Sequence, residues 1–291
     1  ILFKEQLMKL HAKLVGALAA LSMSSAFAVP AFEVPGGQIL DPFGGIDWAS
    51  NGSAFTTDFN QAKANSGTPF VFNMTYFSFA RATSGILDQN GNSYSVPNLF
   101  GGTAVSGSDP FELTIVATFQ EQATCFAGGL VCTFTTVGVG SFDIYLDTAP
   151  NATIGAAAAL SQYNDGTRII GGLISAGPSG TFNALAQNGS TVLQGPVVYT
   201  NNAFINPNLV GSTATGTLQI GGSQTGWLRP DGIVGPDTCN PLAPVDANCT
   251  VAFQADANQT LRIPEPGTVG LLGAAFAGIA LGVSRKRAKR A

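Results

Sequence analysis

Four cysteines are the residues whose type and spacing point most directly to chemistry: Cys125, Cys132, Cys239 and Cys249. An even number of cysteines favours disulfide bonds in an oxidising compartment. Three pairings are possible, and nearest-neighbour pairing, Cys125 with Cys132 and Cys239 with Cys249, would close two short loops. Zinc is the competing interpretation, but the chain has no C-x-x-C spacing, and its one histidine, His11, lies in the first dozen residues. The sequence therefore predicts disulfides, with no metal and no cofactor.

The shortage of histidine also excludes most hydrolytic chemistry. Ser-His-Asp and Cys-His catalysis and histidine-based metal triads all need this residue, and no P-loop, GxGxxG or HExxH motif occurs. A glycosidase that uses two carboxylates stays open, because residues 29–264 hold fifteen acidic residues, Glu33, Glu112 and Glu121 among them. We expect most of these side chains to be solvated on strand faces or in turns. No catalytic residue is predicted, and the protein is not expected to be an enzyme.

Two weaker signals concern ligands. Residues 88–93 (DQNGNS) place oxygen-bearing side chains at alternate positions, as at the start of a calcium loop. A calcium loop needs glycine at its sixth position and glutamate at its twelfth, and this segment has neither there. Asn90-Gly91 therefore favours a plain turn. Trp48 and Trp227 could stack on sugar rings, although burial in the core is the more usual place for tryptophan.

Charge is low and unevenly distributed along the chain. Charged residues make up 10% of the sequence, against about a quarter in an average globular protein. Residues 29–264 carry fifteen acidic and five basic residues, for a net charge of −10, whereas both ends of the chain are basic. An acidic body excludes a nucleic-acid partner. Short basic ends indicate processing signals on an exported domain.

Alternation of apolar and polar residues predicts many β-strands in the body. The pattern is strict in 70–76, 113–119 and 141–146, and turn residues such as Asp165-Gly166 and Asn188-Gly189 separate the segments. Many short strands with Gly and Asn turns favour an all-β, antiparallel β-sandwich-like single domain. Further candidate strands are 132–139, 168–174, 180–186, 191–200, 213–220 and 250–255, and 156–160 is a candidate short helix.

The first 28 residues have the three parts of an export signal. Lys9 and Lys13 are followed by the apolar run 14–21, and the segment ends in a small-x-small cleavage site at Ala26 and Ala28. The apolar run is too short to span a bilayer as a helix. We therefore predict a signal helix at 1–28 that signal peptidase removes.

The C-terminus carries a second three-part signal. Pro264, Glu265 and Pro266 precede an apolar stretch, 267–284, whose 18 residues would make a helix about 27 Å long. The basic residues that follow should stay cytoplasmic and stop transfer through the membrane. They are Arg285, Lys286, Arg287, Lys289 and Arg290. The sequence predicts a C-terminal transmembrane helix that anchors the chain transiently.

The order Pro-Glu-Pro, apolar span, basic tail at the end of the chain resembles the PEP-CTERM sorting signal of Gram-negative bacteria. This resemblance implies recognition by an exosortase, a membrane-embedded cysteine transpeptidase, and a link to exopolysaccharide and biofilm. The body, including 140–151 and 165–180, is similar to flocculation-associated PEP-CTERM proteins along roughly residues 110–264.

These observations define three segments: a signal peptide at 1–28, an exported β-rich domain at 29–262, and a sorting and anchoring segment at 263–291. We expect a non-enzymatic protein that is transiently anchored in the inner membrane and then delivered to the cell surface or extracellular matrix. There it would promote flocculation or biofilm aggregation with exopolysaccharide. The alternatives are a β-sandwich carbohydrate-binding module with an exposed aromatic platform, and a carboxylate-pair glycosidase.

Overall fold

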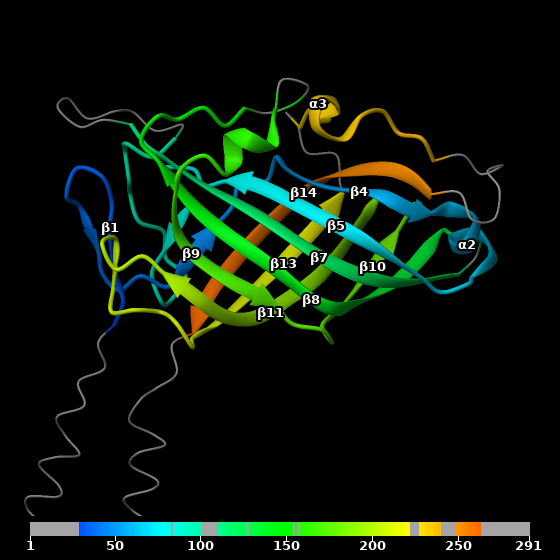
Figure 1. Ribbon diagram of the computed structural model, residues 1–291, viewed down its shortest axis with the longest axis horizontal. Helices are drawn as coiled ribbons and strands as arrows, with labels where there is room; N and C mark the ends of the chain where they lie inside the picture. The colour runs from blue at the N-terminus through cyan, green and yellow to red at the C-terminus, as the bar shows by residue number, and fades with distance from the viewer. Residues whose placement is uncertain are drawn as a thin grey trace, which may run out of the picture. The chain divides into compact units, whose positions relative to one another are not determined.

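The described body of the chain is mostly antiparallel β-structure (Figure 1). The computed structural model describes residues 29–82, 84–100, 110–126, 128–153, 155, 158–221, 227–239 and 248–262. The strands are β1 (Ala31–Glu33), β2 (Ile39–Leu40), β3 (Gly45–Asp47), β4 (Gly52–Asn60), β5 (Phe70–Phe79), β6 (Ile86–Leu87), β7 (Glu112–Phe126), β8 (Val131–Asp147), β9 (Thr167–Ile174), β10 (Ser179–Asn183), β11 (Asn188–Thr200), β12 (Ile205–Asn206), β13 (Thr213–Gly221) and β14 (Asn248–Arg262). The short helices are α2 (Gln61–Ser66), η2 (Leu160–Tyr163) and α3 (Asp231–Val234).

Eight of the described strands form a sheet that closes on itself. β4 pairs with β5, β5 with β7, β7 with β8, β8 with β9, and β9 with β11. β11 then pairs with β13, β13 with β14, and β14 with β4. β9 and β10 lie one after the other in the same place in the sheet, because both pair with β8 and β11. β3 likewise continues the position of β4 along β14, and β6 pairs with β3.

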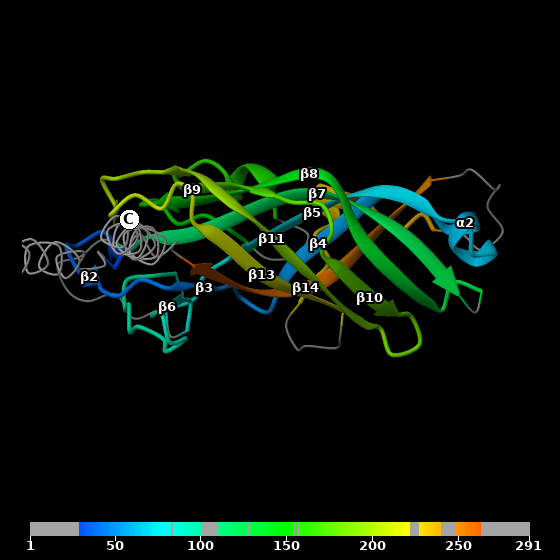
Figure 2. The ribbon, with the colours of Figure 1, turned by 90° about the horizontal axis from the view of Figure 1, so that it is seen from below.

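The remaining strands lie at one end of the closed sheet. β1 pairs with β2 and β12 in a separate three-stranded sheet. Figures 1 and 2 show this small sheet at the end opposite α2, with the long strands running obliquely between the two ends.

Bulges bend the long strands enough to close the sheet. The register shifts between β7 and β8 at Thr118/Gln120, and further shifts occur between β9 and β11 and between β14 and β4. A bulge adds local twist and bends its strand. Gly138 on β8 has φ +67° next to the first of these shifts, a backbone conformation that glycine adopts without strain.

The closed sheet buries side chains on both of its surfaces. Its interior holds the main core, which includes Phe72, Phe119 and Phe142. A second core forms outside β5, where Phe77 and Phe79 are covered by Tyr163 of η2 and by the loops around it. The Thr114 hydroxyl, also on the outside, donates to the Tyr163 carbonyl oxygen at 2.8 Å.

The structure confirms the all-β antiparallel prediction and corrects the sandwich. Instead of two packed sheets, the pairings of β13 with β11 and β14 close the eight long strands into one sheet. The alternation of apolar and polar residues cannot distinguish a sandwich from a closed sheet, because both architectures bury one face of each strand. Asn188-Gly189, predicted as a turn, begins β11, and the turn lies at 184–187. The predicted helix at 156–160 falls partly outside the described residues, and a 3₁₀ helix begins at its last residue.

Candidate functional site

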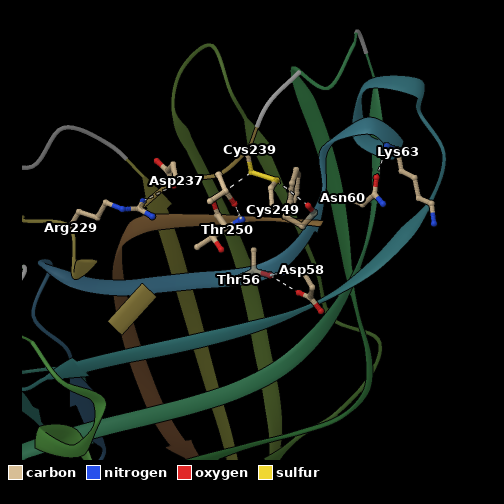
Figure 3. Close-up of a disulfide and its surroundings, with 11 residues drawn as sticks. Thr56, Asp58, Asn60, Lys63, Arg229, Asp237, Cys239, Cys249 and Thr250 are labelled. Carbon is tan, nitrogen blue, oxygen red and sulfur yellow. Dashed lines mark hydrogen bonds and ion pairs between the residues drawn. A yellow bond between two sulfur atoms is a disulfide. The ribbon is translucent and has the colours of Figure 1, made fainter. Parts of the chain in front are cut away.

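The four cysteines form two disulfides with nearest-neighbour pairing. Cys125 at the end of β7 is bonded to Cys132, which lies opposite it at the start of β8. Cys239 is bonded to Cys249 at the start of β14 (Figure 3). The two bonds span 7 and 10 residues of sequence. Both are therefore local closures.

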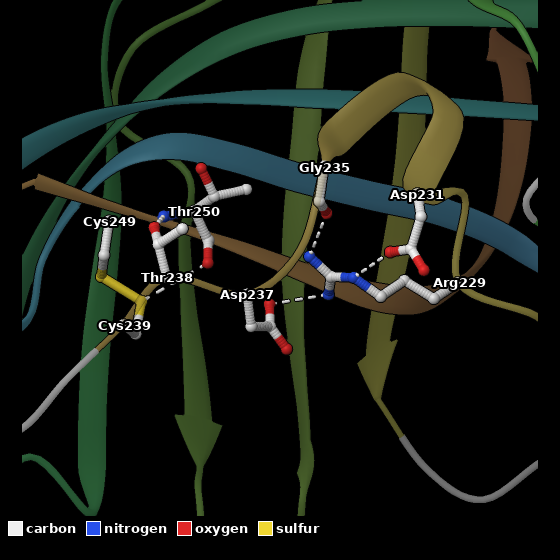
Figure 4. Close-up of polar contacts among 8 residues, drawn as sticks. All are labelled: Arg229, Asp231, Gly235, Asp237, Thr238, Cys239, Cys249 and Thr250. Carbon is white, nitrogen blue, oxygen red and sulfur yellow. Dashed lines mark hydrogen bonds and ion pairs between the residues drawn. A yellow bond between two sulfur atoms is a disulfide. The ribbon is translucent and has the colours of Figure 1, made fainter.

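The second disulfide ends a stretch that we call the covering segment, residues 227–239. Arg229 holds this segment in shape, since its guanidinium contacts Asp231 at 2.6 Å, Asp237 at 2.7 Å and the Gly235 carbonyl oxygen at 2.9 Å (Figure 4). Trp227 Nε1 donates to Ser53 Oγ at 3.0 Å, and α3 contacts β4 and β14. The covering segment thus lies against the outer surface of these two strands.

Two shallow grooves lie on the outer surface of the closed sheet. The first, of about 650 Å³, runs over β10, β11 and β13. The second, of about 610 Å³, runs over β5, β7 and β8. None of the described residues that line them is charged. The polar residues of the first are Thr181, Asn183, Asn188, Ser190, Thr217 and Gln219, and those of the second are Asn73, Thr75, Thr118, Gln120 and Ser141.

A row of uncharged polar side chains crosses the first groove from strand to strand. The cross-strand register places Thr133 beside Thr181, Thr181 beside Ser190, and Ser190 beside Gln219. Neighbouring strands lie about 4.8 Å apart. The outer face therefore presents hydroxyl and amide groups at regular intervals across four strands.

Glu121 is, together with Glu112, one of the two fully buried acids of the described chain. It lies on the inward face of β7, fully buried, between Phe72 of β5 and Thr136 of β8 in the register. Burial raises its pKa to about 7, and the nearby Thr191 hydroxyl only partly opposes this rise. Neither carboxyl oxygen has a hydrogen bond of good geometry to a described residue. Burial of this kind keeps the carboxyl protonated at pH values well above the ordinary pKa of a glutamate, up to about pH 7.

Other acids have structural partners. Glu112, at the start of β7, accepts hydrogen bonds from the backbone N–H groups of Asn151 (3.1 Å) and Ala152 (3.1 Å), and burial raises its pKa. Asp47 and Asp256 lie near each other outside the sheet; burial raises the pKa of Asp47, and the charge of Asp256 adds to the rise. Asp and Glu are absent from the described lining of both grooves and of the interior cavity introduced below.

The interior of the closed sheet contains a cavity of about 50 Å³. Its wall is mostly apolar, and small residues on the inner face, such as Ala117, Ala214 and Gly216, leave the space open. Trp48, Tyr76 and Gln259 also line it. Trp48, Tyr76 and Glu121 were considered in the sequence, but not as parts of one interior, and Gln259 was missed. Extending the alternation of 113–119 by one step would have placed position 121 inside.

The remaining sequence candidates have structural roles. Asp88 accepts hydrogen bonds from the N–H groups of Asn90 (2.7 Å) and Asn92 (2.8 Å), so it stabilises a turn with Gly91 at φ +83°. In the described part of the chain, no three His, Cys, Asp or Glu residues gather as metal ligands. Trp48 is buried inside the sheet, and Trp227 is half-buried.

Both processing signals lie outside the described residues. These include the cleavage residues Ala26 and Ala28, the motif Pro264, Glu265 and Pro266, and the basic tail 285–290. The predicted C-terminal transmembrane helix lies there too. Within the described ranges, the structure contains no helix with the length and hydrophobicity needed to cross a membrane.

Comparison with known proteins identifies the C-terminal signal. Residues 262–287 match the PEP-CTERM protein-sorting motif. No curated protein and no solved structure matches the chain. The motif indicates an exported protein that transits the membrane and is processed by an exosortase. The likeness of the body to flocculation-associated proteins stays a prediction.

Proposed function

We propose that this exported protein acts, without catalysis, as an adhesin at the cell surface or in the extracellular matrix of a Gram-negative bacterium. Sorted through its C-terminal motif, it would promote flocculation or biofilm aggregation by holding exopolysaccharide on the outer face of its closed sheet.

The main support for an adhesive role is the pair of outer grooves, whose described lining residues are all uncharged. Polysaccharides present many hydroxyl groups, which threonine, serine, asparagine and glutamine side chains can match as donors and acceptors. The body as a whole carries −10, so direct ion pairs with an acidic polymer are unfavourable. Neutral contacts in the grooves avoid this repulsion.

The two alternatives have less support. A carbohydrate-binding module of the predicted kind needs an exposed aromatic platform, whereas the Trp48 side chain faces the interior and Trp227 Nε1 is engaged by Ser53. A retaining or inverting glycosidase needs two carboxylates within about 5–10 Å in a cleft. Acids that lie near one another in the described body, such as Asp47 with Asp256 and Glu112 with Asp147, line neither groove.

Sorting is tested by changing the motif. We expect Glu265→Ala to keep the protein in the membrane fraction, because an altered motif prevents exosortase processing, while Glu33→Ala on β1 should be delivered as the unchanged protein is. Fractionation of the culture followed by immunoblotting measures both. Deletion of 264–291 should also change the location or the form of the product. Identical fractionation of all of these proteins would contradict exosortase sorting.

Groove binding is tested by removing hydroxyl groups without changing shape. Thr181→Val and Thr217→Val each delete one hydroxyl from the first groove, and each should weaken binding of the strain's purified exopolysaccharide about fivefold, the usual value of one hydrogen bond. Co-sedimentation at increasing polysaccharide concentration measures the affinity. Thr57→Val, at an exposed position of β4 outside both grooves, is the matched control. Equal binding by all three variants would rule out the groove as the adhesive surface.

A further inference from the structure

The interior cavity has polar groups that nothing in the described structure satisfies. Trp48 Nε1, Tyr76 OH and Gln259 Oε1 each belong to a side chain that lines the cavity, and each lacks a hydrogen-bond partner among the described residues. The three residues are 2%, 2% and 7% exposed. The Ser78 hydroxyl, which donates to the Ala49 carbonyl oxygen, lies near Tyr76 but does not form a hydrogen bond of good geometry with the Tyr76 hydroxyl. A buried polar group without a partner is costly, so a ligand that paired with these three groups would be bound favourably.

Three different strand positions contribute these side chains. Tyr76 is on β5, Gln259 is on β14, and Trp48 directly follows β3. In the register, Gln259 lies opposite Gly216 of β13, and Gly216 lies opposite Leu193 of β11. Because Gly216 has no side chain, the space beside the Gln259 amide stays open. A closed sheet of eight strands has an interior that side chains can fill or that can hold one small ligand.

We propose that this cavity is a binding site for a small, uncharged molecule that carries a hydroxyl group on an apolar body. A hydroxyl can accept a hydrogen bond from Trp48 Nε1 and donate one to Gln259 Oε1, with Tyr76 OH able to serve as a second donor or acceptor. The apolar wall, which includes Ile115, Phe142 and Leu218, takes the rest of the molecule.

The absence of ionised groups in the described wall defines the ligand class. No Asp, Glu, Lys or Arg lines the cavity among the described residues. Burial raises the pKa of Tyr76, so its phenol stays neutral. A charged ligand would lose its hydration without gaining a counter-charge, which is strongly unfavourable.

The cavity lies just inside the grooved outer wall. Leu173, near the end of β9, lines both the cavity and the second groove, and Thr217 lines both the cavity and the first groove. β9 ends one residue later, at Ile174, and β10 begins at Ser179.

The probe that fits is 1-propanol, because a cavity of about 50 Å³ has room for about three or four water molecules. With four non-hydrogen atoms, this alcohol cannot bind more tightly than about 40 µM. We expect saturable binding in about the millimolar range, measured on the intact exported protein by saturation-transfer NMR. Gln259→Leu should weaken it about fivefold, and Tyr76→Phe should have a smaller effect.

Cavity filling provides the decisive control. Ala117→Leu and Ala257→Leu each place a larger side chain in the cavity wall and should abolish 1-propanol binding, while circular dichroism establishes that each variant is folded. Xenon, followed by ¹²⁹Xe NMR, reports an apolar void. Xenon binding without 1-propanol binding, or no binding of either, would overturn the proposal in favour of an empty or water-filled cavity. Propanol binding that survives both fillings would place the site elsewhere and overturn it too.

Discussion

Replacing Glu121 by glutamine is expected to stabilise the folded protein by about 3 kcal/mol at about pH 8 and to change its stability little at about pH 4. The unfolded chain ionises Glu121 near its ordinary pKa of 4.5, whereas the buried carboxyl titrates at about 7. Between these values the folded state binds more protons, so its stability falls as the pH rises from 4.5 to 7. Glutamine has nearly the same shape and cannot ionise, so this loss disappears.

Urea unfolding across this pH range measures the effect. Glu33→Gln on β1 is the control, because it makes the same substitution at an exposed position. No charged group of the described ranges affects the titration of Glu121, so the difference between Glu121→Gln and the unchanged protein isolates burial. If the two proteins lose stability in parallel above about pH 5, the carboxyl is hydrated in the folded state and the interpretation is wrong.

Loss of both disulfides is the second large effect. Replacing each cysteine pair by serine should cost about 2–3 kcal/mol per bond, because closing loops of 7 and 10 residues restricts the unfolded chain by about this amount. Together the four substitutions should remove about 5 kcal/mol, which is comparable to the whole stability of many domains. Urea unfolding of each serine variant, compared with the unchanged protein in its oxidised and reduced forms, measures the loss in free energy of unfolding.

The two bonds should differ in their local effects. Cys125 and Cys132 join β7 and β8, which their backbone ladder already holds together along most of their length. The other bond fastens the covering segment, which Arg229 stabilises mainly from within. Serine at 239 and 249 should therefore expose the covering segment to limited proteolysis before global unfolding, and serine at 125 and 132 should not. Equal protease sensitivity would show that other contacts hold the segment.

The sequence predicted individual strands better than their assembly. The alternation in 70–76 and 113–119 located β5 and β7, but it could not show that β13 joins β11 to β14 and closes the sheet. Residues 132–139 and 141–146 looked like two strands, because Gly138 and Gly140 interrupt the pattern, yet they form the single bulged strand β8. β4 was missed, since its burial does not alternate regularly.

The candidate sites were predictable where the chemistry is local. Cysteines 7 and 10 residues apart form their nearest-neighbour bonds, and the C-terminal signal is a linear motif. The grooves and the interior cavity depend on cross-strand neighbours such as Gly216 and Gln259, which lie 43 residues apart in the chain. Only the register brings such residues together.

Closure of the sheet has a consequence for how copies of this protein can associate. Each of the eight long strands pairs with a neighbour on both sides over at least part of its length, so these strands leave fewer backbone groups open for fibre growth by strand addition than the edges of an open sheet would. Aggregation of cells through this protein would then rest on discrete molecules that cross-link a separate polymer. The number of polysaccharide-binding grooves on each molecule, rather than the length of a protein filament, would then determine how many polymer chains one molecule connects.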